Sequence, residues 1–136
     1  MRVVAIWAGL LLVCVTPIAV ATTSPLLEWR TPVYIGAGLC GVVSLSLMFL
    51  QPLLAGRALP GLSAIQHRVS HRSIGIAITL LVVLHVLGLW ITSPPDVIDA
   101  LLFVSATPFS VWGVIAMWSV LITACLLYTS PSPRDS

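Results

Sequence analysis

Long apolar runs alternate with short polar segments along the chain. The runs cover residues 3–22, 33–54, 67–91 and 109–127. A helix of twenty residues at 1.5 Å per residue reaches about 30 Å, the thickness of the hydrocarbon core of a bilayer. The pattern therefore predicts an all-α fold, a polytopic membrane helix bundle with about four transmembrane helices.

Serine and proline mark the limits of the third run. Ser63 follows Pro60-Gly61 and belongs to a residue type that caps helices. Ser93-Pro94-Pro95 ends the run, because two successive prolines cannot continue a helix. The following stretch, residues 97–104, is too short to span a bilayer, so we expect it to lie along the membrane surface.

Two apolar runs carry further signals. The first run could be a signal peptide, since Arg2 precedes it and Ala19-Val20-Ala21 resembles a cleavage site. We favour a retained helix because the run is longer than a usual signal core. The second run contains small residues four apart, the pairs Gly36/Cys40 and Ala37/Gly41. This spacing predicts close helix packing in lipid.

The composition excludes an ordinary soluble domain. Hydrophobic residues make up 59% of the chain, charged residues 7%, and the mean hydropathy is +1.12. Soluble domains carry about 25% charged residues, so most of this surface must face lipid. A net charge of +2 is too small for nucleic-acid binding. The three cysteines form no CxxC motif, which argues against zinc ribbons and c-type haem attachment.

The charged residues predict an orientation. Arg57, Arg68 and Arg72 lie between the second and third runs or at the start of the third, with no acidic residue. Asp96 and Asp99 lie between the third and fourth runs, with no arginine. The positive-inside rule places the arginines and the N-terminus in the cytoplasm and the aspartates outside.

All three histidines lie in the third run, at positions 67, 71 and 85. His85 has no charged neighbour within ten residues, and an ionisable group deep in a membrane helix suggests a function. His71 and His85 share one helix face, offset by roughly 21 Å along the axis. That arrangement suits axial ligands of two stacked haems. A metal-bound imidazole is also neutral, so it can lie in the membrane without the cost of a buried charge.

Neighbouring residues could serve the same haems. Gly75 and Gly88 each lie about one turn after a histidine and would leave room for a porphyrin. Arg68 and Arg72 could pair with haem propionates. His67 competes with His71 as the inner ligand, although its offset from His85, roughly 27 Å, would place an iron at the headgroups.

Simpler interpretations of these residues remain open. A histidine in a membrane helix can be an interhelical hydrogen bond or a proton relay in a cofactor-free transporter or structural subunit. The arginines can be topology signals and the glycines packing sites. A relay is less favoured, because no acid lies within the first, second or fourth apolar run.

The segment SHRSIGIAITLLVVLHVLGLW, residues 70–90, resembles the third helix of the ferric reductase-like transmembrane domain. The family motif reads HR, an apolar residue, Gly, and a second His fourteen positions after the first. His71-Arg72, Ile74-Gly75 and His85 match it. Ser73 stands where the family usually has a bulky residue. The resemblance covers residues 1–124.

The resemblance implies a six-helix bundle with two b-type haems, each held by two histidines. His71 would bind the haem on the cytoplasmic side and His85 the outer one, with the second ligands on a later helix. The implied function is transmembrane electron transfer by the haem-binding component of an oxidoreductase in the bacterial inner membrane. Electrons would come from an FAD- and NAD(P)H-binding domain downstream or on a partner such as a flavin reductase, and a periplasmic protein is a further possible partner. No GxGxxG motif is present.

The C-terminal string CLLYTSPSPRDS resembles translated adapter sequence. We expect residues 125–136 to be non-native, with the natural chain continuing differently. The alternative is a short disordered polar tail.

Overall fold

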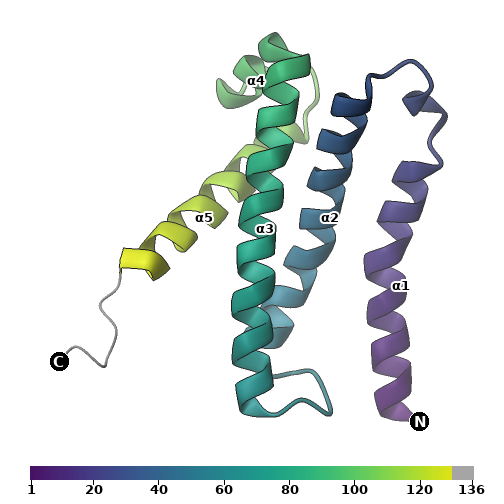
Figure 1. The fold of residues 1–136 in the computed structure, drawn as a ribbon, viewed down its shortest axis with the longest axis vertical. Coiled ribbons are helices and arrows are strands. Elements are labelled where there is room, and N and C mark those ends of the chain that lie inside the picture. The colour runs from purple at the N-terminus through teal and green to yellow at the C-terminus, as the bar shows by residue number, and fades with distance from the viewer. Residues whose placement is uncertain (130–136) are drawn as a thin grey trace. The chain divides into compact units, whose positions relative to one another are not determined.

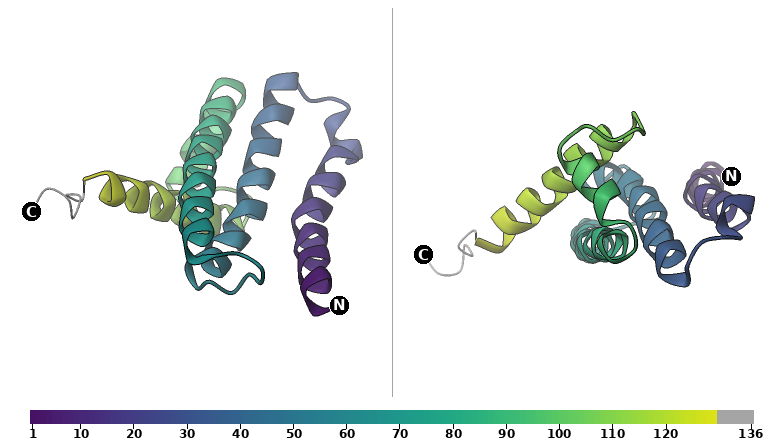
Figure 2. Two further views of the ribbon diagram at one scale, coloured as in Figure 1. Left: turned by 60° about the horizontal axis from the view of Figure 1, so that its bottom comes forward. Right: turned by 90° about the horizontal axis from the view of Figure 1, so that it is seen from above.

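The structure, a computed structural model, describes residues 1–129, which contain helices and no strand. Two units can be distinguished, residues 1–94 and residues 95–136. The first holds three long helices, α1 (Arg2–Thr22), α2 (Pro32–Ala55) and α3 (Ala64–Thr92). They run antiparallel in sequence order, with α2 packed on both α1 and α3 (Figures 1 and 2).

Local sequence explains where these helices begin. The Thr31 hydroxyl accepts a hydrogen bond from the Tyr34 amide at 3.3 Å, and Pro32 occupies the first turn of α2. Ser63 caps α3, as its sequence context predicts. Its hydroxyl accepts from the Gln66 amide at 3.2 Å, while the Gln66 side chain accepts from the Ser63 amide at 2.7 Å. This capping box satisfies two amides that the first turn would otherwise leave unpaired.

Helix α2 ends in a Schellman motif. The Ala58 amide donates to the Leu53 carbonyl at 2.9 Å, and the Arg57 amide donates to the Leu54 carbonyl at 3.2 Å. Arg57 itself is left-handed, with φ 53°, at a position that usually holds glycine. The chain thereby turns sharply toward α3.

The second unit contains α4 and α5 (Ser110–Thr129). α4 (Pro94–Leu101) begins at the double proline that ends α3, since proline is favoured at a first helical position. It covers much of the stretch predicted to be too short to span. The first five residues of the predicted non-native segment, 125–129, continue α5, and the rest of that segment lies outside the described residues.

Three helices of the described chain, α1, α2 and α3, are long and apolar enough to cross a membrane. The fourth apolar run lies in α5, whose apolar part over Ser110–Leu126 is shorter than those three helices. The prediction of an all-helical membrane fold is thus confirmed, with three long spans where about four were expected. The bundle of six helices that the resemblance implies stays a prediction.

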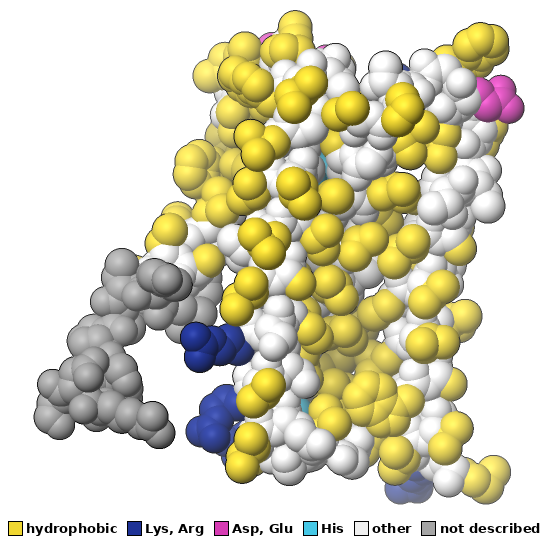
Figure 3. All heavy atoms as spheres, viewed as in Figure 1, with side chains coloured by type: hydrophobic (Ala, Val, Ile, Leu, Met, Phe, Trp, Pro, Cys, Tyr) yellow, Lys and Arg dark blue, Asp and Glu magenta, His cyan; other side chains and the backbone are white. Residues whose placement is uncertain are grey.

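The first unit exposes its large apolar side chains. No residue of α1 is buried, and residues such as Leu45, Leu80 and Leu84 are 55–66% exposed. The buried set instead includes the polar side chains of Ser44, Ser46 and His67. Figure 3 shows hydrophobic side chains along the helices and charged ones toward their ends. This distribution, with large apolar side chains exposed and some polar ones buried, fits a lipid environment rather than water.

Small residues bring α2 and α3 together. A side chain added at Gly88 of α3 would meet the Ala37 β-carbon at 2.6 Å, and one added at Gly41 of α2 would meet the His85 ring at 2.7 Å. At Gly36 and Gly38 it would meet nothing within 4 Å. The predicted close packing is therefore confirmed for the pair Ala37/Gly41.

Helix α1 contacts its neighbours more loosely. The Trp7 indole donates to the Pro60 carbonyl at 3.2 Å, and the Cys14 thiol donates to the Ser46 carbonyl at 3.6 Å. An apolar groove of about 410 Å³ lies between α1 and α2 near Pro17 and Phe49. These few contacts place α1 beside α2 without burying any of its side chains.

Candidate functional site at the α2–α3 interface

One face of α3 carries the histidines predicted as site residues. His67, His71, Ile78, Val82 and His85 recur at the spacing of an α-helix. His67, Ile78 and Val82 are the buried residues of α3, at 4%, 2% and 8% exposed. His71 and His85 are half-buried on the same face, which packs on α2.

His85 is held by the backbone of α2. Its Nδ1 donates to the Ala37 carbonyl at 2.7 Å, since a carbonyl oxygen can only accept. The ring lies directly over Gly41, where a β-carbon would be only 2.7 Å from Nδ1. A proton on Nδ1 leaves the lone pair of the neutral imidazole on Nε2. Among the described residues, the structure gives Nε2 no hydrogen-bond partner.

His71 lies beside Gln51 of α2. The Gln51 side-chain amide donates to the backbone carbonyl of His71 at 3.3 Å. The Gln51 Oε1 and the His71 Nδ1 are both buried and have no hydrogen-bond partner in the described chain. An unpaired buried polar atom costs about 1–3 kcal/mol.

His67 is the most buried of the three histidines. Its Nδ1 donates to the Ser63 carbonyl at 3.0 Å, and its Nε2 is buried without a partner among the described residues. The bond to Ser63 ties the ring to the first turn of its own helix. His67 therefore remains an alternative to His71 as the inner ligand.

Both predicted site glycines face α2. A β-carbon at Gly75 would lie 3.3 Å from the Gln51 side-chain nitrogen, and one at Gly88 would lie 2.6 Å from the Ala37 β-carbon. In this structure the absent side chains give room to α2. Their predicted role beside a porphyrin stays a prediction.

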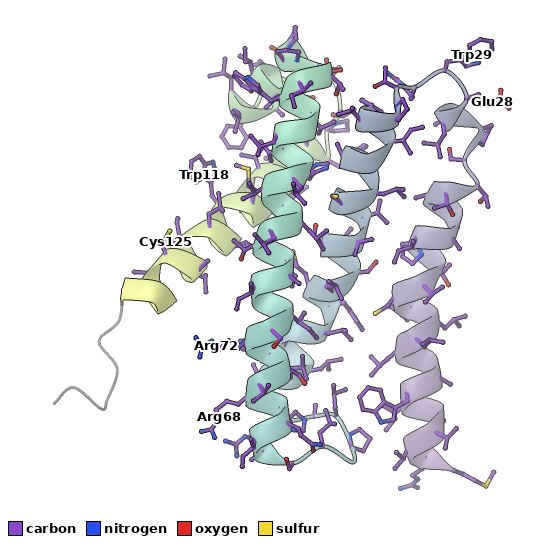
Figure 4. The ribbon with its side chains drawn as sticks, viewed as in Figure 1. Glu28, Trp29, Arg68, Arg72, Trp118 and Cys125 are labelled. Atoms are coloured by element: carbon purple, nitrogen blue, oxygen red, sulfur yellow. The ribbon has the colours of Figure 1, made fainter. Side chains whose placement is uncertain are left out.

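The two predicted propionate partners lie on a different side of α3. Arg68 and Arg72 are exposed and project away from α2, one turn apart (Figure 4). No ion pair is formed by either within the part of the chain that the structure describes. Glu28 and Trp29 lie at the opposite end of the first unit (Figure 4).

The described residues hold no group of three or more His, Cys, Asp or Glu side chains that could bind a metal ion together. A site built from several ligands of this chain is therefore not found in residues 1–129. The three histidines each stand with different partners along α3.

No protein-family model matches the chain, and the comparisons with curated proteins and with solved structures gave no match.

Sequence reasoning missed the contributions of α2. The Ala37 carbonyl has no side-chain signal beyond the small-residue pair that lets α3 approach. Gln51 did have one, because an amide inside an apolar membrane run is costly without a partner. Its position, fourteen residues after Ala37, matches the spacing of His71 and His85.

Proposed function

We propose that the chain is part of a haem b-binding membrane protein that carries electrons across the bilayer. The observation that carries the proposal is the shared face of α3, on which His85 and His71 stand fourteen residues apart and His85 is fixed through Nδ1. Metal-ligating histidines almost always donate their other ring nitrogen to a carbonyl, a carboxylate or water. The His85–Ala37 bond is of that kind.

The donor set fits haem better than a bare metal ion. A haem would carry four nitrogen ligands of its own, so single histidines such as His71 and His85 would each need to supply only one ligand. Further ligands would come from a helix other than the three described above, since all three histidines lie on α3.

The length of α3 suits two such sites. An offset of roughly 21 Å between His71 and His85 puts one position in each leaflet of a core about 30 Å thick. Haem iron, when bound, moves single electrons by alternating between its ferric and ferrous states. The chain would bind and orient the two haems and keep water from them.

The basic end of the first unit supports an orientation. Arg57, Arg68 and Arg72 lie at or near the α2–α3 connection, which we place on the cytoplasmic side of a bacterial inner membrane. Arg68 and Arg72, which project away from α2, would then meet lipid phosphates at that surface, and their pairing with propionates stays a prediction. The electron donor would be a flavin reductase, as a domain or a partner, on the same side.

The proposal is tested by electron transfer across sealed vesicles. Vesicles containing the wild-type protein, with ferricyanide trapped inside and dithionite outside, should show faster loss of ferricyanide than vesicles with the His85→Ala variant. The reduced sample should also show low-spin b-type absorption bands. Equal rates in the two preparations, together with no haem absorption in folded wild type, would rule the proposal out.

A second candidate rests on the same hydrogen bond. The His85 Nδ1 bond to the Ala37 carbonyl is also what a purely structural interhelical contact looks like. The chain would then be a cofactor-free membrane transporter or structural subunit. In that case wild type binds no haem, while His85→Ala still weakens the association of α2 with α3.

A further inference from the structure

Two pairs of residues join α2 to α3 at the same register. Fourteen residues separate Ala37 from Gln51 on α2, and fourteen separate His71 from His85 on α3. Because the helices are antiparallel, Ala37 meets His85 at one end and Gln51 meets His71 at the other. Each histidine of the candidate pair thus has its own polar partner on α2.

The pair at His85 is complete. The Ala37 carbonyl accepts a hydrogen bond from the Nδ1–H group, which fixes the tautomer and the ring plane. The ring has little freedom to turn, since Gly41 lies against it. Nε2 is left as the nitrogen that can bind a metal.

The pair at His71 is half complete. The Gln51 side-chain NH₂ group donates to the His71 backbone carbonyl. The Gln51 Oε1 and the His71 Nδ1 are both buried without partners in the described chain. One of these atoms accepts hydrogen bonds, and the other donates when it carries the ring proton. A hydrogen bond between them would satisfy both atoms.

Gly75 controls where the Gln51 amide can lie. Its absent β-carbon would stand 3.3 Å from the Gln51 nitrogen, closer than most β-carbons approach a neighbour. A methyl group there would force the amide to shift by a few tenths of an ångström. The glycine therefore leaves room for the Gln51 amide in its present position.

We propose that Gln51 is a positioning residue for His71: its Oε1 accepts a hydrogen bond from Nδ1–H, so that Nε2 of His71 becomes the metal-binding nitrogen, as the Ala37 carbonyl does for His85. The tautomer assignment stands on the contacts of α2 and α3 alone. Its consequence for iron rests on the proposed function. Helix α2 would then orient both histidines without touching a haem iron.

The first test reads the histidine tautomers without any cofactor. The chain with ¹⁵N-labelled histidine is placed in lipid nanodiscs, and the ring nitrogens are followed by NMR. Wild type should show His71 protonated at Nδ1. Gln51→Leu should lower that tautomer severalfold, Gln51→Glu should retain it because a carboxylate oxygen also accepts, and Ser46→Ala should leave it unchanged.

Ser46 is a suitable control because its hydroxyl donates within α2 itself, to the Val42 carbonyl at 3.1 Å. His67→Phe tests the competing acceptor, the buried Nε2 of His67. A His71 tautomer that survives Gln51→Leu but is lost in His67→Phe would overturn the proposal. So would a His71 ring protonated at Nε2 in wild type.

The second test uses haem. Outer partners of metal-binding histidines typically contribute about 10–100-fold to affinity, so Gln51→Leu should weaken one haem site by about tenfold or more and leave the other unchanged. Gln51→Glu should restore binding. Wild type without haem would defeat the proposed function while the NMR result still decides the tautomer. Haem bound equally by wild type and Gln51→Leu would defeat the role of Gln51 alone.

Discussion

At the scale of the residue, the His85 ring is held by two contacts with α2. Its ring is bonded to the Ala37 carbonyl and rests on Gly41 at a separation that no β-carbon could share. The constraint needs a glycine at position 41. At Gly38, three residues earlier in α2, nothing would meet a β-carbon within 4 Å.

Gly41→Ala should therefore destabilise the α2–α3 pair by about 1–3 kcal/mol, the usual cost of overpacking a filled site. The added methyl group would drive the His85 ring away from its carbonyl. SDS titration of the protein in mixed micelles, followed by circular dichroism, measures the change. Gly38→Ala is the matched control and should be neutral or stabilising by up to about 1 kcal/mol, since alanine favours a helix. Equal effects of the two substitutions would show that the ring does not rest on Gly41.

At the scale of the element, the sequence predicted where helices begin more accurately than which helix faces pack together. α1 and α2 begin one residue before the predicted runs, and α3 begins three residues earlier than its run, directly after the predicted cap Ser63. Caps and prolines act locally, so a sequence reveals them. Which face of α3 meets α2 depends on small residues in two distant segments, and periodicity alone did not pair Ala37 with His85.

The capping box of α3 gives an element-scale prediction. Ser63→Ala removes the acceptor of the Gln66 amide and should cost about 1 kcal/mol at the start of the helix. Hydrogen exchange of the Gln66 amide should speed up about fivefold, as that free energy implies. Ser73→Ala, an exposed serine farther along α3, should leave the exchange rate unchanged. An unchanged rate in Ser63→Ala would mean that the cap contributes nothing there.

At the scale of the whole molecule, the three long spans turn most apolar side chains outward and keep their histidines against α2. The membrane character could be predicted from hydropathy because it depends on composition. The candidate site could be predicted only in part, because the sequence marks the histidines and not the backbone carbonyl that orients one of them. The charged residues indicate an orientation in the membrane. Arg57 lies at the α2–α3 connection, and Glu28 and Trp29 lie at the α1–α2 connection.

This orientation predicts labelling from one side only. In a background without native cysteines, Trp29→Cys should react with a membrane-impermeant maleimide added to intact cells. Ala58→Cys, next to Arg57, should react only after the cells are permeabilised. Both positions are exposed, so reactivity reports sidedness rather than burial. The opposite labelling pattern would reverse the proposed orientation.

The most direct test of the central claim is the haem content of the purified protein expressed from its complete gene. We predict a low-spin b-type spectrum with two haems per chain in wild type and about one in His85→Ala, because each histidine of α3 serves one iron. The control Leu84→Ala changes an exposed neighbour and should keep both haems. A folded wild type without haem, or a His85→Ala variant with the full wild-type content, would contradict the account.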